Sequence, residues 1–360
     1  MDPDKEEPRI GLMDRLMRPA AVVGAFAGFI TAAFRRANPG AAPRKARPAA
    51  APRPEQLFQL KTAALELPRR YSRTAVIGGA NSAHPFRQSL TGVAVGSTGR
   101  IYVLGDDEVR IFESDGKFVQ GWPVLRNASG MALAADGRVY VGAAGVVDIY
   151  SSDGSRSSGF AAGDTGKPAV ITAIKVFKNE ILIADADARV IRRYDAGGRQ
   201  LGLIGASLRS GGFMLPNRRL DFDVDAGGIV RATDPGRHLV TTWNLQGQRL
   251  GFFGKFGMSD PADFVGCCNP VNIAVTPDGK IVTAEKMVAR VKVYEPEGKL
   301  LAVIGPENFD PNCLQIHLAV DSRGRILAGD TVRREVKIFS PDSKPAPAGL
   351  SRKPEEGGLP

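Results

Sequence analysis

Short apolar runs separated by turn residues recur along most of this chain of 360 residues. Six times a run of strand length ends in an aromatic residue, and a turn residue follows four positions later, with glycine in five of the six. These aromatics, 38 to 51 residues apart, are Phe112, Tyr150, Tyr194, Trp243, Tyr294 and Phe339. A fixed period of this length predicts a repeat architecture.

Each repeat predicts four antiparallel strands. Upstream of the aromatic strand lie two further strands joined by a tight turn, as in VAVGSTGRIYVL (93–104) and LAVDSRGRILAG (318–329). Downstream, most copies carry a fourth strand, such as KLLAVIG (299–305). Short apolar strands joined by Asp-Gly, Thr-Gly and Arg-Gly turns are hairpin signals. Six such units predict an all-β protein, a six-bladed β-propeller.

The units resemble NHL repeats, and the pattern is clearest in two of them. The residues that carry the resemblance are ILIADADARVIRRY (181–194) and ATDPGRHLVTTW (232–243), each a strand ending in an acidic residue, a turn and an aromatic strand. The run GCCNP, TAEK, RVKVY within 266–294 is similar to a subset of bacterial NHL-type proteins. The second unit departs from the pattern, because VYVGAAGVVDIY (139–150) lacks the acidic residue. The resemblance covers about residues 74–340 and implies the fold, but no particular activity.

The sixth unit has no fourth strand of its own. Prolines at 341, 345 and 347 follow its aromatic residue, and proline cannot serve within a central ladder. The sequence TAVIG of Thr74–Gly78 closely matches the LAVIG of Leu301–Gly305. We therefore expect Thr74–Gly78 to complete the sixth blade and close the ring, so that the propeller spans residues 74–340.

The flanks of the propeller have a different composition. Residues 1–36 contain an apolar run at 19–34, which is shorter than the roughly 20 residues of a spanning helix. It is compatible with a short helical membrane anchor, a secretory signal or a plain soluble helix. The sequence favours membrane association or export through this run, with a soluble cytoplasmic protein as the alternative. Residues 37–73 read as a Pro/Ala/Arg-rich linker, and 341–360 as a disordered tail.

The formal net charge of +10 lies mostly outside the propeller. Residues 1–73 carry 14 Lys/Arg against 7 Asp/Glu, residues 74–340 carry 31 against 28, and residues 341–360 carry 3 against 3. The excess is therefore +7, +3 and 0. A nearly neutral propeller argues against a nucleic-acid partner, because such binding depends on phosphate neutralisation.

Sites of propellers lie at the mouth of the channel, where the loops before the innermost strands converge. Aligning the units on that strand places six residues at equivalent positions, namely Gly92, Gly130, Ala173, Asp221, Asn272 and His317. Three small residues thus face three polar ones. The candidate ligand contacts at this mouth are Asp221, Asn269, Asn272, Glu285, Lys286 and Arg290. Alternatively, the last three are an acid and bases that tie the fifth blade's hairpin together.

The three cysteines form the second candidate site. Cys268 and Cys313 are equivalent in the alignment, Cys267 is adjacent, and His317 follows closely. Such a set predicts either a soft-metal site for zinc or copper(I), or a redox pair. The alternative is that the thiols are buried small apolar groups. A bridge between Cys267 and Cys268 is not expected, because a disulfide between neighbouring residues is strained.

The sequence favours a binding or scaffold module over an enzyme. Only three histidines are present, and His238 matches the histidine of the NHL hairpin while His84 precedes the first blade. Metal-dependent propeller enzymes need several His, Asp or Glu residues around a channel metal. We therefore expect a protein or small-molecule partner at the rim. The alternative is a metal-binding or redox-active propeller that uses the cysteine set.

Overall fold

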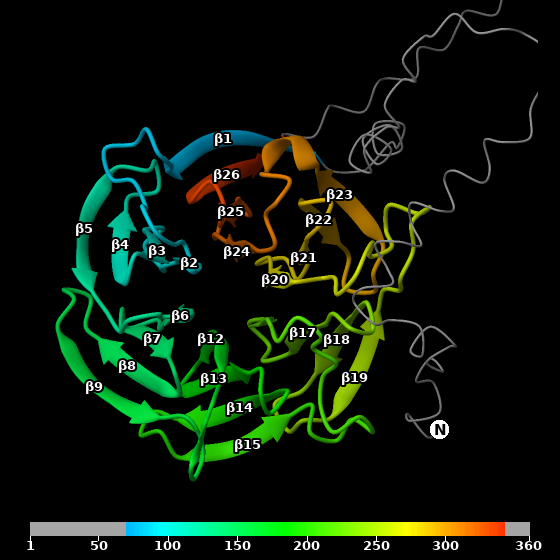
Figure 1. Cartoon of the computed structure of the whole chain (residues 1–360), viewed down its shortest axis with the longest axis horizontal. Helices are drawn as coiled ribbons and strands as arrows, with labels where there is room; N and C mark the ends of the chain where they lie inside the picture. The colour runs from blue at the N-terminus through cyan, green and yellow to red at the C-terminus, as the bar shows by residue number, and fades with distance from the viewer. Residues whose placement is uncertain (1–69, 343–360) are drawn as a thin grey trace, which may run out of the picture. The chain divides into compact units, whose positions relative to one another are not determined.

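The computed structural model describes residues 70–342, which form a ring of six four-stranded antiparallel sheets (Figure 1). Each sheet is a blade whose first strand lies nearest the centre of the ring and whose fourth lies on the outside. The predicted all-β, six-bladed propeller is confirmed. The predicted apolar helix and the tail from residue 343 lie outside the described residues, as does the linker up to residue 69.

Five blades are each built from four strands that are consecutive in sequence. Blade 1 consists of β2 (Gly92–Val95), β3 (Ile101–Gly105), β4 (Glu108–Phe112) and β5 (Phe118–Pro123). Blade 2 consists of β6 (Gly130–Leu133), β7 (Val139–Ala143), β8 (Val146–Tyr150) and β9 (Arg156–Ala161). A two-stranded hairpin, β10 (Gly163–Asp164) and β11 (Lys167–Pro168), precedes blade 3.

Blade 3 consists of β12 (Ile171–Phe177), β13 (Glu180–Asp185), β14 (Val190–Asp195) and β15 (Gln200–Ile204). Blade 4 consists of β16 (Phe222–Val224), β17 (Val230–Asp234), β18 (Leu239–Trp243) and β19 (Arg249–Phe253). Blade 5 consists of β20 (Asn272–Val275), β21 (Ile281–Glu285), β22 (Arg290–Tyr294) and β23 (Leu300–Ile304). A single 3-10 turn, Pro306–Asn308, connects it to blade 6.

Blade 6 combines the two ends of the described chain. Its inner strands are β24 (Ile316–Val320), β25 (Ile326–Asp330) and β26 (Glu335–Pro341), and its outer strand is β1 (Tyr71–Gly78). β1 pairs with β26 in antiparallel register, with Ile77 opposite Val336. The predicted closure is thus confirmed, although the strand begins at Tyr71 rather than Thr74. Tyr71 packs against the core between blades 5 and 6, which extends the pairing.

The glycine that follows five of the six aromatic strands is required by the packing of neighbouring blades. These glycines have positive φ, for example +91° at Gly154 and +94° at Gly298. A Cβ at Gly154 would lie 2.6 Å from Trp122 in the outer strand of the preceding blade, and one at Gly298 would lie 2.7 Å from Phe253. The recurring glycine therefore allows both the turn and the close approach of the next blade.

The hydrophobic core lies between adjacent blades. One cluster joins residues of blade 5, such as Val291 and Ile304, to residues of blade 6, such as Ile316 and Phe339. The second strands are buried on both faces, and β21 is buried along its whole length. Over residues 70–342 no helix is long and apolar enough to cross a membrane.

Candidate functional site at the channel mouth

The six aligned inner-strand residues occupy equivalent places in the structure. Gly92, Gly130, Ala173, Asn272 and His317 each pair with the penultimate residue of the second strand of their blade. Asp221 stands in the same relation to Thr233, since its carbonyl accepts the Thr233 N–H at 2.9 Å. The predicted alignment is confirmed, with small residues in blades 1 to 3 and polar ones in blades 4 to 6.

Asp221 connects blades 4 and 5 at the channel. Its Oδ2 accepts hydrogen bonds from Asn272 Nδ2 at 2.9 Å and from the Ile273 N–H at 3.1 Å. Burial raises the pKa of Asp221, although Lys175 acts in the opposite direction. Asn272 is buried, and its Oδ1 has no hydrogen-bond partner among the described residues. The predicted candidates Asp221 and Asn272 are therefore brought together by a direct bond.

Lys175 adds a cation from blade 3 to this group. Its Nζ lies 3.1 Å from Asp223 Oδ1, and the other carboxylate oxygen of Asp223 accepts the Val275 N–H at 2.8 Å. Burial alone would lower the pKa of Lys175, but Asp223 and Asp221 outweigh it and raise the pKa. Lys175 is therefore a charged and fixed part of the channel wall, linked through Asp223 to blade 5.

Arg219 is the channel cation without such a pairing. It lies in the loop before β16, half-buried, and makes no hydrogen bond or ion pair with any other residue in 70–342. Burial lowers the pKa of Arg219, and Asp221 acts in the opposite direction. An arginine stays protonated even so. A partly desolvated guanidinium therefore faces the channel with its donors unused.

His317 is the second polar group near Arg219. Burial, and then the positive charge of Arg219, lower the pKa of His317 to about 3. The imidazole is therefore neutral at physiological pH, with one nitrogen as a donor and the other as an acceptor. It therefore offers a donor and an acceptor to the channel, without charge.

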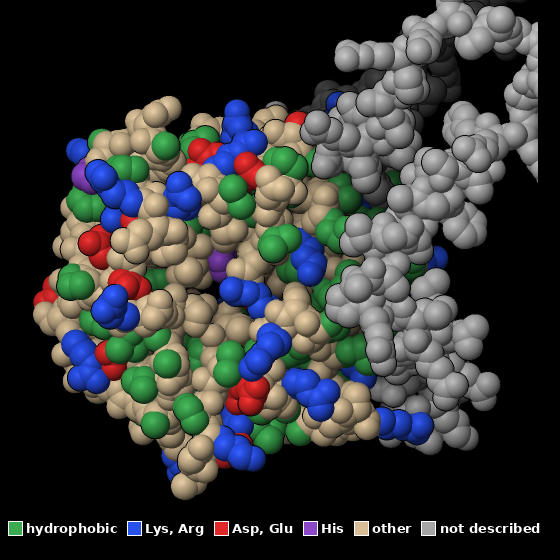
Figure 2. Space-filling view, in the orientation of Figure 1, with side chains coloured by type: hydrophobic (Ala, Val, Ile, Leu, Met, Phe, Trp, Pro, Cys, Tyr) green, Lys and Arg blue, Asp and Glu red, His purple; other side chains and the backbone are tan. Residues whose placement is uncertain are grey.

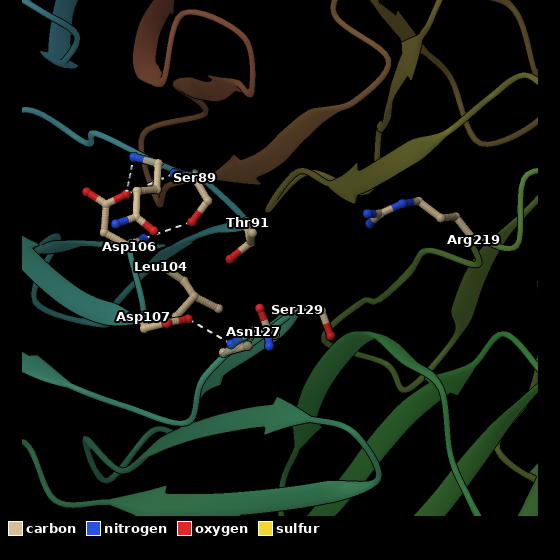
Figure 3. A pocket seen from close by; sticks show the side chains of 10 residues that line it. Ser89, Thr91, Leu104, Asp106, Asp107, Asn127, Ser129 and Arg219 are labelled. Atoms are coloured by element: carbon tan, nitrogen blue, oxygen red, sulfur yellow. Dashed lines mark hydrogen bonds between the residues drawn. The ribbon is translucent and has the colours of Figure 1, made fainter.

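A cavity of about 320 Å³ opens at this mouth. Loops before β2 and β6 and the β3–β4 turn form one side, and Arg219 reaches in from the other; its guanidinium points toward Thr91 and Ser129 (Figure 3). Figure 2 shows a central opening on this face, with Lys and Arg side chains around it and a histidine inside. The charged groups that line the cavity are therefore one cation, Arg219, and two carboxylates, Asp106 and Asp107.

The two carboxylates of the cavity wall are already used by the backbone. Asp106 accepts the N–H groups of Arg87, Gln88 and Ser89 at 2.7 to 2.8 Å. Asp107 accepts the Asn127 N–H at 2.7 Å. These bonds fix the shape of the loops. For Asp106 they also outweigh the effect of burial and lower the pKa, and so favour the charged carboxylate.

Glu285 and Arg290 lie away from the opening and are fully buried. They face each other across the β21–β22 pair and form an ion pair, with Lys292 Nζ 3.3 Å from the same carboxylate oxygen. Burial raises the pKa of Glu285 most, but Lys292 and Arg290 together outweigh it and lower the pKa. The alternative interpretation, in which these residues tie the β21–β22 hairpin together, is confirmed for Glu285 and Arg290. A ligand contact by Lys286 stays a prediction.

Asn269 fixes the cysteine loop. Its side chain donates to the carbonyls of Val265 and Lys286, at 2.5 and 3.1 Å, and accepts the Lys286 N–H at 2.9 Å. Asn269 is 0% exposed and precedes a cis proline. It therefore acts in the described chain as a clamp between the loop and the end of β21, and Lys286 takes part through its backbone.

The thiols do not gather as expected. Cys267 Sγ and Cys268 Sγ lie 2.6 Å apart, whereas the Cys313 thiol donates to the Gln315 carbonyl at 2.7 Å within the core. His317 belongs to the channel. Among residues 70–342 no group of three or more His, Cys, Asp or Glu side chains could hold a metal ion. The described chain therefore gives the predicted zinc or copper(I) site no support.

Lys175 and Arg219 were not identified from the sequence as cations of the channel mouth. Lys175 lies two residues after Ala173 in the same strand, so alternation would have placed both side chains on one face. Arg219 lies two residues before Asp221, within the polar run Asn217-Arg218-Arg219. Nothing in that run distinguishes the inward arginine from its exposed neighbour, Arg218.

Comparison with known proteins identifies the fold alone. No protein-family model and no curated protein matches the sequence. Among solved structures, a streptogramin B lyase shares 10% identity over 77% of this chain and 96% of its own, with a TM-score of 0.51. Virginiamycin B lyase from Staphylococcus aureus shares 12% sequence identity. The match covers 75% of this chain and 99% of the lyase, with a TM-score of 0.50. The WD40 propeller domain of Doa1 shares 15% sequence identity. The match covers 75% of this chain and 97% of that domain, with a TM-score of 0.51. The chain is similar in architecture to these β-propellers, and at such identities the likeness extends no further.

Proposed function

We propose that this protein is a binding module whose channel mouth takes up an anionic group, carried either by a small molecule or by a segment of a partner protein. One observation carries the proposal: Arg219 projects into the mouth cavity without a hydrogen bond or ion pair in the described chain. A desolvated cation is unfavourable unless it is paired. A ligand anion would supply the missing partner.

The cavity suits this role in size and rigidity. Its volume of about 320 Å³ lies within the roughly 300 to 1,000 Å³ that is usual for small-ligand sites. Its loops are held by Asp106 and Asp107, so little ordering is needed on binding. A guanidinium matches a carboxylate or a phosphate in a two-pronged geometry. We infer a ligand with one such group.

Three further features belong to this proposal. The repeats are of the NHL type, on the residues of blades 3 and 4 given above. The propeller is attached to, or exported across, a membrane through residues 19–34. The rim loops, which vary from blade to blade on a rigid ring, provide the partner specificity. The WD40 neighbour is compatible with a protein partner.

The test compares Arg219→Ala with Arg218→Ala. Arg218 is the neighbouring arginine, exposed and paired with Asp187 at 2.9 Å, and therefore a matched control. The probes are inorganic phosphate, citrate and a short peptide with a free C-terminal carboxylate. A probe at a hundred times its Kd stabilises the folded state by about 2.7 kcal/mol, which a thermal shift readily detects.

We expect at least one probe to raise the Tm of the protein and of the Arg218 variant, but not that of the Arg219 variant. Loss of the shift in both variants would indicate general electrostatic attraction and contradict the assignment to Arg219. Absence of any shift with all three probes in the unmodified protein would reject the proposed anion site.

A further inference from the structure

We propose that Cys267 and Cys268 form a reversible disulfide, against the expectation from the sequence, so that the loop between blades 4 and 5 is a two-electron redox site. The strain of a bridge between neighbouring residues makes such a bond easier to reduce, which is consistent with a reversible one. This proposal does not depend on a ligand at the channel mouth. It rests on the placement of two neighbouring thiols, on the way their loop is anchored, and on their unequal exposure.

The two sulfur atoms are already placed for a bond. Their separation of 2.6 Å is well inside the contact distance of non-bonded sulfurs, although longer than the roughly 2.05 Å of a disulfide. The backbone turns sharply here, with φ of +71° at Gly266 and +65° at Cys268. This turn brings both side chains to the same side of the chain, where extended neighbours would point apart.

The loop is anchored on both sides of the pair. On one side, the Gly266 carbonyl lies 2.8 Å from His238 Nε2 of blade 4, and the Val265 N–H donates to Glu285 at 2.9 Å. On the other side, Asn269 holds the chain to Lys286. Anchors on each side keep the thiols together in the reduced state. The entropy lost on forming the bond is correspondingly small.

The two thiols differ in access. Cys267 is exposed, whereas Cys268 is only 3% exposed. Burial, and then the hydrogen bond and charge of Cys267, raise the pKa of Cys268 to about 12. Cys267 is therefore the thiol that an oxidant in solution reaches first, and Cys268 is the one that completes the bond.

The oxidant is a small disulfide, and the exchange balances. The Cys267 thiolate attacks one sulfur of the donor, forms a mixed disulfide and releases one donor thiolate, which takes up a proton. Cys268 then loses its proton and attacks Cys267 Sγ, and the second donor thiolate leaves and is protonated. The protein is oxidised by two electrons, and the donor is reduced to two thiols.

Cys313 does not compete for this bond. It is 0% exposed, and its thiol donates to the Gln315 carbonyl within the core of blades 5 and 6. Burial raises the pKa of its thiol. Cys313 is therefore an internal control that should stay reduced under the same conditions.

The sequence allows a direct test on the full chain. Trypsin releases residues 256–280, which contain both neighbouring cysteines, and residues 300–323, which contain Cys313. The folded protein is incubated with oxidised glutathione, quenched in acid, alkylated after denaturation and analysed by peptide mass spectrometry. We expect peptide 256–280 to lose the mass of two hydrogens and to take up no alkyl group. Dithiothreitol should restore two alkylation sites.

Cys267→Ser should abolish the loss of hydrogens, and Cys313→Ser should leave it unchanged; circular dichroism checks that both variants fold. Three outcomes would overturn the proposal: two alkylated cysteines in peptide 256–280 after oxidation, a stable glutathione adduct on it, or a cross-link to peptide 300–323. The last would instead support a bridge between Cys268 and Cys313.

Discussion

The buried charge cluster of blade 5 leads to a quantitative prediction. Glu285 accepts the Val265 N–H at 2.9 Å, forms the ion pair with Arg290 and lies 3.3 Å from Lys292 Nζ. The side chains of the three charged residues are at most 1% exposed. Glu285→Gln keeps the size of the side chain but removes its charge. It removes the carboxylate that Arg290 and Lys292 share.

We expect this change to lower the free energy of unfolding by about 3–5 kcal/mol, the usual cost of removing one partner from a buried ion pair. The loss should not be larger, because Lys292 can release its proton. Burial already lowers the pKa of Lys292, and Glu285 is the main opposing influence. Arg290 has no such escape, since a guanidinium stays charged. The residual cost therefore belongs mainly to Arg290.

The measurement is urea-induced unfolding, followed by tryptophan fluorescence and circular dichroism. Glu297→Gln is the matched control, because Glu297 is exposed on the β22–β23 turn of the same blade and should change stability by less than about 0.5 kcal/mol. A loss below about 1 kcal/mol for Glu285→Gln, with the transition still cooperative, would refute the reasoning. It would mean that water or local rearrangement solvates the two cations.

Two other predictions follow. Ile77→Ala in the closing strand, where Ile77 is 3% exposed, should lower the free energy of unfolding by about 2–5 kcal/mol in thermal or urea unfolding. Val76→Ala, at a residue that is 45% exposed, should lower it by less than about 0.5 kcal/mol. Equal effects of the two substitutions would contradict the closure of the ring. The pKa of His317 is lower in the folded state than in the unfolded state, so stability is retained above about pH 6.5 and lost as the pH falls toward 3. By pH 5 the loss from this group is about 2 kcal/mol. His317→Gln should remove this contribution to the dependence of stability on pH, while His238, whose pKa is also lowered, keeps its own contribution. An unchanged pH dependence in the variant would argue against the lowered pKa of His317.

The fold could be predicted because its signals are local and repeated. The turn glycine after five of the six aromatic strands is explained both by its positive φ and by the blade that packs on it, as at Gly154 against Trp122. The closing strand was found from its likeness to Leu301–Gly305. Its start at Tyr71 was not, because no local pattern reports that Tyr71 packs against a core made by the other end of the chain.

The channel mouth could be predicted only in part. Alignment found Asp221 and Asn272, which do bond to each other, because they occupy one register position in neighbouring blades. The same equivalence failed to bring the thiols of Cys268 and Cys313 together, since register fixes the backbone and not the direction of a side chain in a loop. The contact of Cys267 with Cys268 depends on a left-handed residue that composition does not reveal.

The ring closure has a consequence for how the chain could be rearranged. The N–H of Asp342 donates to the carbonyl of Arg70 at 3.0 Å, so the two ends of the described chain are hydrogen-bonded neighbours at the edge of blade 6. A short linker between them would make the ring covalently continuous. The chain could then be cut open in the loop between any two blades. Such a circular permutant would keep all six sheets, and it would move the non-covalent seam away from β1 and β26.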